Sequence, residues 1–324
     1  MKRNILKSIS LLLVLLLALT MPTLATDAAS SPAPENSAPL VEDLELSTFR
    51  GVAALGTLIA TDPDGDAFEF QIVQAPRKGD LELDPATGHF TYTPREGKRG
   101  RDLFTYVAVD ALGNISSEAT VRLRIERQSR DVHYTDMDGH RAHFAAVELA
   151  ERDIFVGEQV GGRHFFNPNA PVRRGEFLAM ALRTADADIL PGIVRTGFAD
   201  DAEIASWLKP YVSTAVIDGI VQGFRYDGSL IFAPNDYINV SEAAMVLNSL
   251  LDLYDVPVNA GSYAPVWAQQ ATSNLRAEHI ISSNYPGVYQ SALTRADAAQ
   301  MLLGTTALLE GRSVPTPSLL GWAS

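Results

Sequence analysis

The chain has 324 residues, of which 46% are hydrophobic and 20% are charged, a balance typical of globular domains and with room for two or three of them. It contains no cysteine, which excludes disulfides, thiolate metal sites, a cysteine nucleophile and a lipid-modified cysteine. The formal net charge of −13 argues against nucleic acid and anionic membranes as partners, because such partners are bound mainly by positive charge.

Residues 1–25 have the features of a secretory signal peptide. A basic start is followed by an apolar run from Ile9 to Leu19 and by small residues up to Ala25, after which we expect cleavage. The run is shorter than the roughly 20 residues of a membrane-spanning helix, which disfavours an anchor. Cleavage removes three positive charges and no acid, so the net charge moves from −13 to −16. Export without disulfides favours a Gram-positive bacterium as the source.

Residues 26–38 are small, polar and proline-bearing, and we expect a flexible linker there. From residue 39 to residue 127, short segments of alternating polarity are separated by turn signals, which predicts an all-β, immunoglobulin-like sandwich. The predicted strands are 67–73, 80–83, 89–93, 103–109 and 119–125.

Three motifs follow one another between Thr61 and Asn114. The first is the acidic turn Asp-Pro-Asp-Gly-Asp, the second pairs two short strands across a glycine turn, and the third ends in Gly-Asn. Their order resembles the cadherin-like, immunoglobulin-like repeats of bacterial surface proteins. The resemblance implies a module that binds a partner and does not catalyse a reaction.

The acidic turn is the one metal-binding hint in this region. Asp62, Asp64 and Asp66 offer carboxylates close together, and calcium prefers several oxygen ligands. Asp102 and Asp110 could complete the shell if the fold brings the loops together. A solvated turn is the alternative, since Asp, Pro and Gly are common turn residues. Calcium is therefore a possible cofactor, and we expect no other.

The rest of the chain repeats one pattern three times, at residues 131–187 (copy one), 195–255 (copy two) and 260–310 (copy three). The copies open 64 and 65 residues apart, and each reads as a helix, a glycine-bearing loop and a second helix. Such units bury their apolar faces against one another, so we predict an all-α region. Residues 311–324 form a predicted loose tail.

The second helix of each copy has a different start. Asn239 with Glu242, and Thr294 with Asp297, predict capping boxes in copies two and three. In copy one Arg173 stands at the cap position, so we expect that helix to be closed in another way.

The three copies share an aromatic start, a glycine-bearing loop, a Phe-x-Pro segment and a helix start similar to Thr-Arg-Ala-Glu. This ordered set resembles the S-layer homology (SLH) family over roughly half of the chain. The resemblance implies a pseudo-threefold helical unit that holds a surface protein to a pyruvylated secondary cell-wall polysaccharide. It also implies that Arg174 and Arg295 bind the acidic ketal, with Gly157 and Gly223 in the loops that close the pocket. Copy two has Val240 in place of the arginine.

Physical arguments for the two arginines point both ways. An arginine just inside a helix start is disfavoured by the helix dipole, so its repetition at Arg174 and Arg295 suggests a negatively charged partner. A helix N-terminus with an arginine can cradle a carboxylate, whereas an ion pair with an acid of a neighbouring copy is the structural alternative.

Phe144, Trp207 and Trp267 occupy equivalent positions in the three copies. We predict that they fill a shared core, because aromatic residues dominate core burial. The alternative is that the two tryptophans flank sugar-binding grooves.

No spaced zinc pair, nucleophile elbow, phosphate loop or dinucleotide motif is present in the sequence. We therefore expect no enzyme, but a secreted, non-catalytic protein at the cell wall that displays an immunoglobulin-like module and binds an acidic wall polysaccharide. Because the chain is acidic, this binding needs local pockets. A structural surface-layer scaffold whose degenerate copies bind other surface-layer proteins is the first alternative, and a secreted cell-wall enzyme is the second.

Overall fold

A computed structural model gives the fold of the protein, and the predicted signal peptide lies outside the residues that it describes. The described residues are 36–130, 132–258, 264–281 and 289–311.

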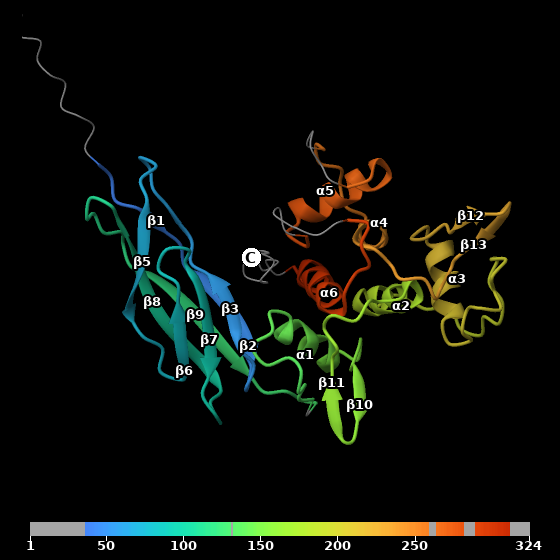
Figure 1. Ribbon diagram of the computed structural model, residues 1–324, viewed down its shortest axis with the longest axis horizontal. Helices are drawn as coiled ribbons and strands as arrows, with labels where there is room; N and C mark the ends of the chain where they lie inside the picture. The colour runs from blue at the N-terminus through green and yellow to red at the C-terminus, as the bar shows by residue number, and fades with distance from the viewer. Residues whose placement is uncertain (1–35, 131, 259–263, 282–288, 312–324) are drawn as a thin grey trace, which may run out of the picture. The chain divides into compact units, whose positions relative to one another are not determined.

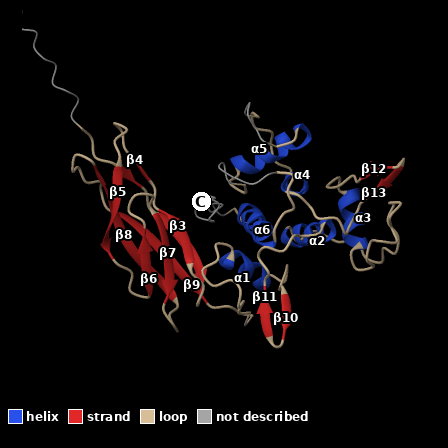
Figure 2. Ribbon diagram, in the orientation of Figure 1, coloured by secondary structure: helices blue, strands red, loops and turns tan. Residues whose placement is uncertain are grey.

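An N-terminal β-sandwich precedes a mostly helical region (Figures 1 and 2). One sheet has the strand order β2-β9-β8-β5, the other has the order β3-β7-β6, and β1 pairs with β4. β2 runs parallel to β9, whereas every other pair in the two sheets is antiparallel. The strands are β1 (Leu40–Val41), β2 (Leu44–Phe49), β3 (Ala54–Thr57), β4 (Ala60–Thr61), β5 (Phe68–Gln74), β6 (Gly79–Leu83), β7 (His89–Pro94), β8 (Gly100–Asp110) and β9 (Ala119–Glu126).

The sandwich core follows from the alternation of the strands. Every second residue of β9 is buried, and Tyr92, Phe104 and Tyr106 are fully buried between the sheets. The five predicted strands are confirmed within a few residues, and so is the sandwich. β2 was missed because its inward and outward positions do not alternate regularly, with Phe49 and Thr48 both buried.

Within the described residues, each copy of the helical region carries two α-helices joined by a longer segment. Apolar residues at helical spacing are buried as predicted, including Val147 and Ala150 in the first helix and Phe177 and Leu182 in the second. Among the described helices, none is both long and apolar enough to cross a membrane. The helices are α1 (His143–Glu151), α2 (Arg174–Thr184), α3 (Lys209–Ile217), α4 (Val240–Leu251), α5 (Gln269–Ala277) and α6 (Arg295–Leu309), and a short 3-10 turn, η1 (Val266–Ala268), leads into α5.

The predicted loops of copies one and two contain β-hairpins, so the all-α prediction is wrong there. β10 (Glu158–Val160) pairs with β11 (Arg163–Phe165), and β12 (Phe224–Tyr226) pairs with β13 (Ser229–Ile231). The turns are Gly161-Gly162 and Asp227-Gly228, and all four residues have positive φ. Two-residue turns with positive φ match the twist of the flanking strands, and Gly-Gly and Asp-Gly are their usual sequences. The signal was therefore present in the sequence.

The segments that lead into the second helices of the three copies meet in a ring of backbone hydrogen bonds. Val172 N–H donates to the Leu293 carbonyl at 2.9 Å, Leu293 N–H to the Ile238 carbonyl at 2.8 Å, and Ile238 N–H to the Val172 carbonyl at 3.0 Å. All three residues are buried. Each copy therefore supplies one donor and one acceptor to the same closed contact.

The first helices of the copies also end alike. The residues Asp153, Gly219 and His279 have φ of +59°, +72° and +57°. In each case the next residue donates its N–H back to the carbonyl five residues earlier, for example Ile220 to Ala215 at 2.8 Å. This is the left-handed closure of a Schellman motif, repeated three times.

Candidate functional site

Two helices start with the predicted arginines. Arg174 and Arg295 occupy the first helical positions of α2 and α6, and their side chains are 15% and 18% exposed. Each reaches across to the hairpin-bearing segment of another copy. A buried cation at such a place needs partners, and the partners define the two candidate sites.

Arg174 is held by copy two. Its Nη2 forms an ion pair with the Glu242 carboxylate at 2.9 Å, and its Nη1 donates to the carbonyls of Phe232 and Ala233 at 3.1 and 3.2 Å. The guanidinium carbon lies 5.2 Å from the centre of the Phe224 ring, a cation–π contact. Both terminal nitrogens of Arg174 therefore bond to protein groups.

Arg295 is held by copy one in a similar way. Its Nη1 donates to the Phe166 carbonyl at 3.1 Å, which is the counterpart of the Phe232 carbonyl at Arg174. It forms an ion pair with Glu158 at 2.9 Å and lies 5.3 Å from the Phe155 ring centre. The structural alternative from the sequence, an ion pair with an acid of a neighbouring copy, is thus present at both arginines.

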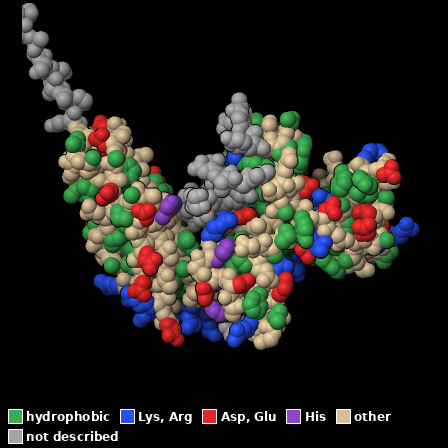
Figure 3. All heavy atoms as spheres, in the orientation of Figure 1, with side chains coloured by type: hydrophobic (Ala, Val, Ile, Leu, Met, Phe, Trp, Pro, Cys, Tyr) green, Lys and Arg blue, Asp and Glu red, His purple; other side chains and the backbone are tan. Residues whose placement is uncertain are grey.

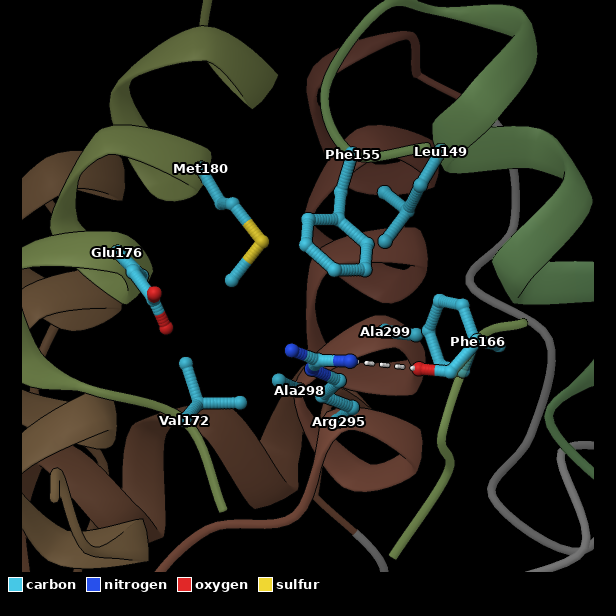
Figure 4. A pocket seen from close by; sticks show the side chains of 9 residues that line it. All are labelled: Leu149, Phe155, Phe166, Val172, Glu176, Met180, Arg295, Ala298 and Ala299. Carbon is cyan, nitrogen blue, oxygen red and sulfur yellow. Dashed lines mark hydrogen bonds between the residues drawn. The ribbon is translucent and has the colours of Figure 1, made fainter. Parts of the chain in front are cut away.

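Arg295 also lines a small, open depression at the surface. In Figure 4 its guanidinium lies below Phe155 and Met180, and the dashed line marks its bond to the Phe166 carbonyl. Leu149, Phe155, Phe166, Val172, Met180, Ala298 and Ala299 form apolar walls, and Glu176 is the one acid in the lining. We call this feature the Arg295 pocket.

The amides at the start of α2 and α6 are not open to an anion, which corrects the prediction of a helix-terminus cradle. The N–H groups of Arg174 and Gly175 donate to the carbonyls of Asp236 and Pro234 of copy two at 2.8 and 3.0 Å. The N–H groups of Arg295 and Ala296 donate likewise to copy one. With these donors occupied, only the guanidinium is left to meet an anion.

These backbone bonds satisfy the first amides of α2, where Arg173 stands at the cap position in place of a usual capping residue. The expectation that this helix start is closed in another way is thus confirmed. The Glu176 carboxylate adds a bond from the Arg173 N–H at 3.3 Å. The predicted capping box of Asn239 and Glu242 is confirmed, with bonds of 2.9 and 3.0 Å.

The other predicted box is only half formed. Thr294 accepts from the Asp297 N–H at 3.1 Å, but the Asp297 carboxylate binds Arg141 at 2.6 Å and does not reach back to Thr294. A cation from another copy competes for this carboxylate, and the sequence of the helix start alone could not show it.

Copy two has no arginine at the equivalent helix start. Val240 is buried with 1% exposure, and the neighbouring Ser241 donates its N–H and its hydroxyl to the Tyr289 carbonyl. The described contact of this helix start with copy three is therefore made by a neutral side chain, Ser241.

Gly157 and Gly223 are positions where a side chain does not fit. Both have positive φ, and an added Cβ would lie 2.5 Å from the Phe165 carbonyl oxygen or 2.3 Å from the Phe198 ring. Because these positions carry no side chain, the hairpins pack against Tyr134 and Phe198. The next residues along the chain, Glu158 and Phe224, then contact Arg295 and Arg174. Their role in the described structure is to shape the loops.

The two tryptophans do not fill a shared core, so that prediction is wrong for them. Trp207 is 58% exposed and Trp267 is 56% exposed, while the equivalent Phe144 is half-buried. The Trp207 ring touches Tyr211 edge to face with centres 6.3 Å apart. Within the described residues, no ring or hydrogen-bond contact joins either tryptophan to Arg174 or Arg295.

The five predicted calcium ligands do not converge. Asp102 and Asp110 lie near opposite ends of β8, eight residues or roughly 26 Å apart at strand rise, so they cannot share an ion. Asp62 accepts from the N–H groups of Asp64 and Asp66 as in an ordinary turn. Among the described residues no three His, Asp or Glu side chains form a group that could hold a metal. The residues present therefore do not fit the predicted calcium shell.

Asp102 has a structural task instead. It accepts from the N–H groups of Arg77 and Lys78 at 3.0 and 2.7 Å and from the Tyr92 hydroxyl at 2.8 Å. Burial raises the pKa of this carboxyl, but the hydrogen bonds outweigh burial and hold the pKa below its usual value.

Sequence reasoning missed the partners of the arginines and a pair of backbone clamps. Asp136 accepts from Phe166 N–H and Asn167 N–H at 2.9 and 2.6 Å, and Asp200 accepts from Phe232 and Ala233 in the same way. A signal existed, because an aspartate stands third in the opening of copies one and two. These clamps fix the two carbonyls that receive the arginines.

Comparison with known families identifies the first part of the chain. Residues 26–127 match the bacterial cadherin-like domain, so the chain carries such a domain, which is typical of extracellular and surface proteins. The match includes the predicted linker and ends where the sandwich ends, so the SLH resemblance of the three copies stays a prediction from the sequence. No curated protein matches the chain.

Similarities to solved structures are weak and partial. A putative alpha-galactosidase of Bacteroides fragilis is 18% identical, with 28% of this chain and 18% of that chain covered and a TM-score of 0.23. Drosophila N-cadherin EC1–3 is 16% identical, with 31% and 35% covered and a TM-score of 0.25. A PKD domain of an archaeal M14-like peptidase (Thermoplasmatales) is 25% identical, with 28% and 97% covered and a TM-score of 0.22. The chain thus spans well under half of the first two proteins.

Proposed function

We propose that the protein is a non-catalytic surface protein that is held to an acidic cell-wall polysaccharide at the Arg295 pocket. The observation that carries this proposal is the pairing of a largely buried guanidinium with an easily displaced acid. Arg295 is 18% exposed, whereas its partner Glu158 is 54% exposed at the start of β10. An incoming carboxylate can take the place of Glu158 without leaving a buried charge unpaired, because the released glutamate already faces solvent.

The chemistry of the pocket suits a sugar that carries an acidic ketal. A guanidinium binds a carboxylate through two parallel hydrogen bonds, and one ring face of Phe155 with the Met180 side chain offers apolar contact to a methyl group or a sugar ring. The ring of hydrogen bonds among the three copies supports the pseudo-threefold unit that the SLH resemblance implies, since that unit requires equivalent contacts from each copy.

Arg174 is a weaker candidate than the sequence suggested. Its acid Glu242 is 30% exposed and also closes the capping box of α4, so displacing it would open a helix start. We therefore infer one working pocket, at Arg295, and a structural role for Arg174.

The test is co-sedimentation of the protein with purified cell-wall sacculi, before and after mild acid removes the ketal-linked acid. We expect Arg295→Gln to weaken binding about tenfold or more, as loss of a charge-assisted pair predicts, and Arg174→Gln to change binding little while lowering stability. The proposal fails if untreated sacculi do not pellet the protein, or if stripping the acid leaves binding unchanged.

A surface-layer scaffold that binds other proteins is the second candidate, favoured by the exposed tryptophans. Trp207 and Trp267 are more than half exposed, and such residues are enriched where proteins bind one another. Replacing both with alanine should abolish pelleting with surface-layer protein while leaving binding to protein-free sacculi intact, if the scaffold candidate holds.

A further inference from the structure

The cations of the sandwich gather at one of its ends. Within residues 37–127, Arg122 lies in the middle of β9, while every other Lys and Arg lies in the turns and strand termini of a single end. We call this the basic end. Its residues are Arg50, Arg77, Lys78, Arg95, Lys98, Arg99, Arg101, Arg124 and Arg127.

The topology brings these residues together. The turns after β2, β5 and β7 all lie at the same end of the sandwich. The start of β8 lies there too, because it pairs with the end of β9, with Gly100 opposite Ile125. The Lys78 ammonium donates to the Arg99 carbonyl at 2.9 Å, which ties two of the turns. On the face shown in Figure 3, blue side chains gather at the lower end of the sandwich.

Most of these cations are available. Arg95 pairs with Asp80 and Arg124 with Glu126. The others, apart from Lys78, are exposed and form no ion pair or side-chain hydrogen bond with any described residue. These free cations are Arg50, Arg77, Lys98, Arg99, Arg101 and Arg127.

The arrangement carries a local cost, which the ion pair of Arg124 with Glu126 offsets on one side only. Arg101 stands directly opposite Arg124 on the neighbouring strand, and like charges in such a pair destabilise a sheet. The half-buried carboxylate of Asp102 holds the turn of Arg77 beside them through two backbone hydrogen bonds. The guanidiniums are thus kept near one another on a rigid frame, in a chain whose net charge is −13.

We propose that the basic end binds an acidic polysaccharide through the carboxylate or phosphate groups of successive sugars. Seven of its nine cations are arginines, which fork onto such groups in pairs of parallel hydrogen bonds. Neighbouring strands lie ~4.8 Å apart, so one extended polyanion contacts cations from several strands at once. A polysaccharide fits better than nucleic acid because the sandwich is a domain of extracellular proteins. This surface is separate from the Arg295 pocket and does not depend on it.

The test measures binding of the full chain to polygalacturonate, with neutral dextran as the control polymer, over a series of salt concentrations. The variant Arg77→Ser/Arg99→Ser/Arg101→Ser removes three free cations of the basic end. The matched control, Arg183→Ser/Arg195→Ser/Arg225→Ser, removes three exposed arginines of the helical region and changes the net charge equally.

We expect the first variant to lose about tenfold or more in affinity at low salt and to show a shallower salt dependence, because fewer counterions are released. The control should keep the affinity of the parent. The proposal is overturned if the parent does not bind polygalacturonate, or if both triple variants lose equally, which would show a net-charge effect. Tighter binding to single-stranded DNA than to polygalacturonate would also overturn it. Loss of binding in Arg295→Gln would assign the polymer to the pocket.

Discussion

At the scale of single residues, His143 shows how burial sets a titration. The side chain is 3% exposed at the start of α1. Burial lowers its pKa, as do the charges of His133 and His140, while Asp138 and Asp136 act to raise it. The folded protein therefore holds a neutral imidazole at a pH where the unfolded chain would bind a proton.

This difference predicts a pH-dependent stability. Because the folded pKa of His143 lies below the unfolded value of about 6.5, the free energy of unfolding should fall as the pH drops below about 7, and this contribution should level off below the folded pKa. His143→Phe should remove that part of the slope, measured by urea unfolding of the helical signal at several pH values. His89→Gln, at an exposed position, should keep it. An unchanged slope in His143→Phe would contradict the prediction.

The sequence pointed to Arg174 and Arg295 as candidate site residues but did not identify the acids that bind them. The acids Glu158 and Glu242 lie in a different copy from the arginine they bind, so no spacing within one copy points to them. The exposure of Trp207 was not predictable either, since an aromatic residue at a repeated position is more often buried. Local patterns report local structure, and contacts between copies depend on how the copies pack.

At the scale of elements, the hairpins inside the copies depend on single glycines. At Gly223 an added Cβ would lie 2.3 Å from the Phe198 ring and 2.7 Å from the Ile231 carbonyl oxygen, with φ at +70°. At Gly228, in the turn of the same hairpin, φ is +75° but no atom lies within 4 Å of the added Cβ. Both positions require a positive φ, but only at Gly223 would an added Cβ clash with neighbouring atoms.

Comparing alanine variants at these two positions separates the cost of backbone strain from the cost of a steric clash. We expect Gly228→Ala to lower stability by about 1 kcal/mol, the usual cost of a left-handed conformation for a residue with a Cβ. Gly223→Ala should cost about 1–3 kcal/mol more, because the ring or the strand must move. Urea unfolding of both variants measures the difference, and equal losses would show that the hairpin relaxes freely around residue 223.

The sandwich was predictable at this scale because its strands alternate and its turns carry Gly, Pro and Asp. The order of helix, connecting segment and helix in each copy was predictable from the apolar spacing. The hairpins β10–β11 and β12–β13 were overlooked because each strand has three residues and lies mostly at the surface, so alternation has little room to appear.

At the scale of the whole helical region, the ring among Val172, Ile238 and Leu293 distinguishes a closed unit from an open solenoid. In an open array each unit touches only its neighbours, so removing a terminal unit leaves the others folded. In a closed ring the first and last copies also touch, as the bond from Val172 N–H to the Leu293 carbonyl shows. Removing copy three would leave a buried donor and a buried acceptor without partners.

A chain ended at residue 258 should therefore lose most of its helical order, and not just the third of it that copy three contributes. Far-UV circular dichroism with amide exchange at Val172 and Ile238 measures this, and both amides should lose protection together. Two further losses add to the effect. The Ser241 N–H at the start of α4 would lose its acceptor at Tyr289, and α1 and α2 would lose their packing against α6. If the shortened chain keeps α1 to α4 helical with protected amides, the copies stack as an open array, and the ring is a consequence of packing and does not hold the unit together.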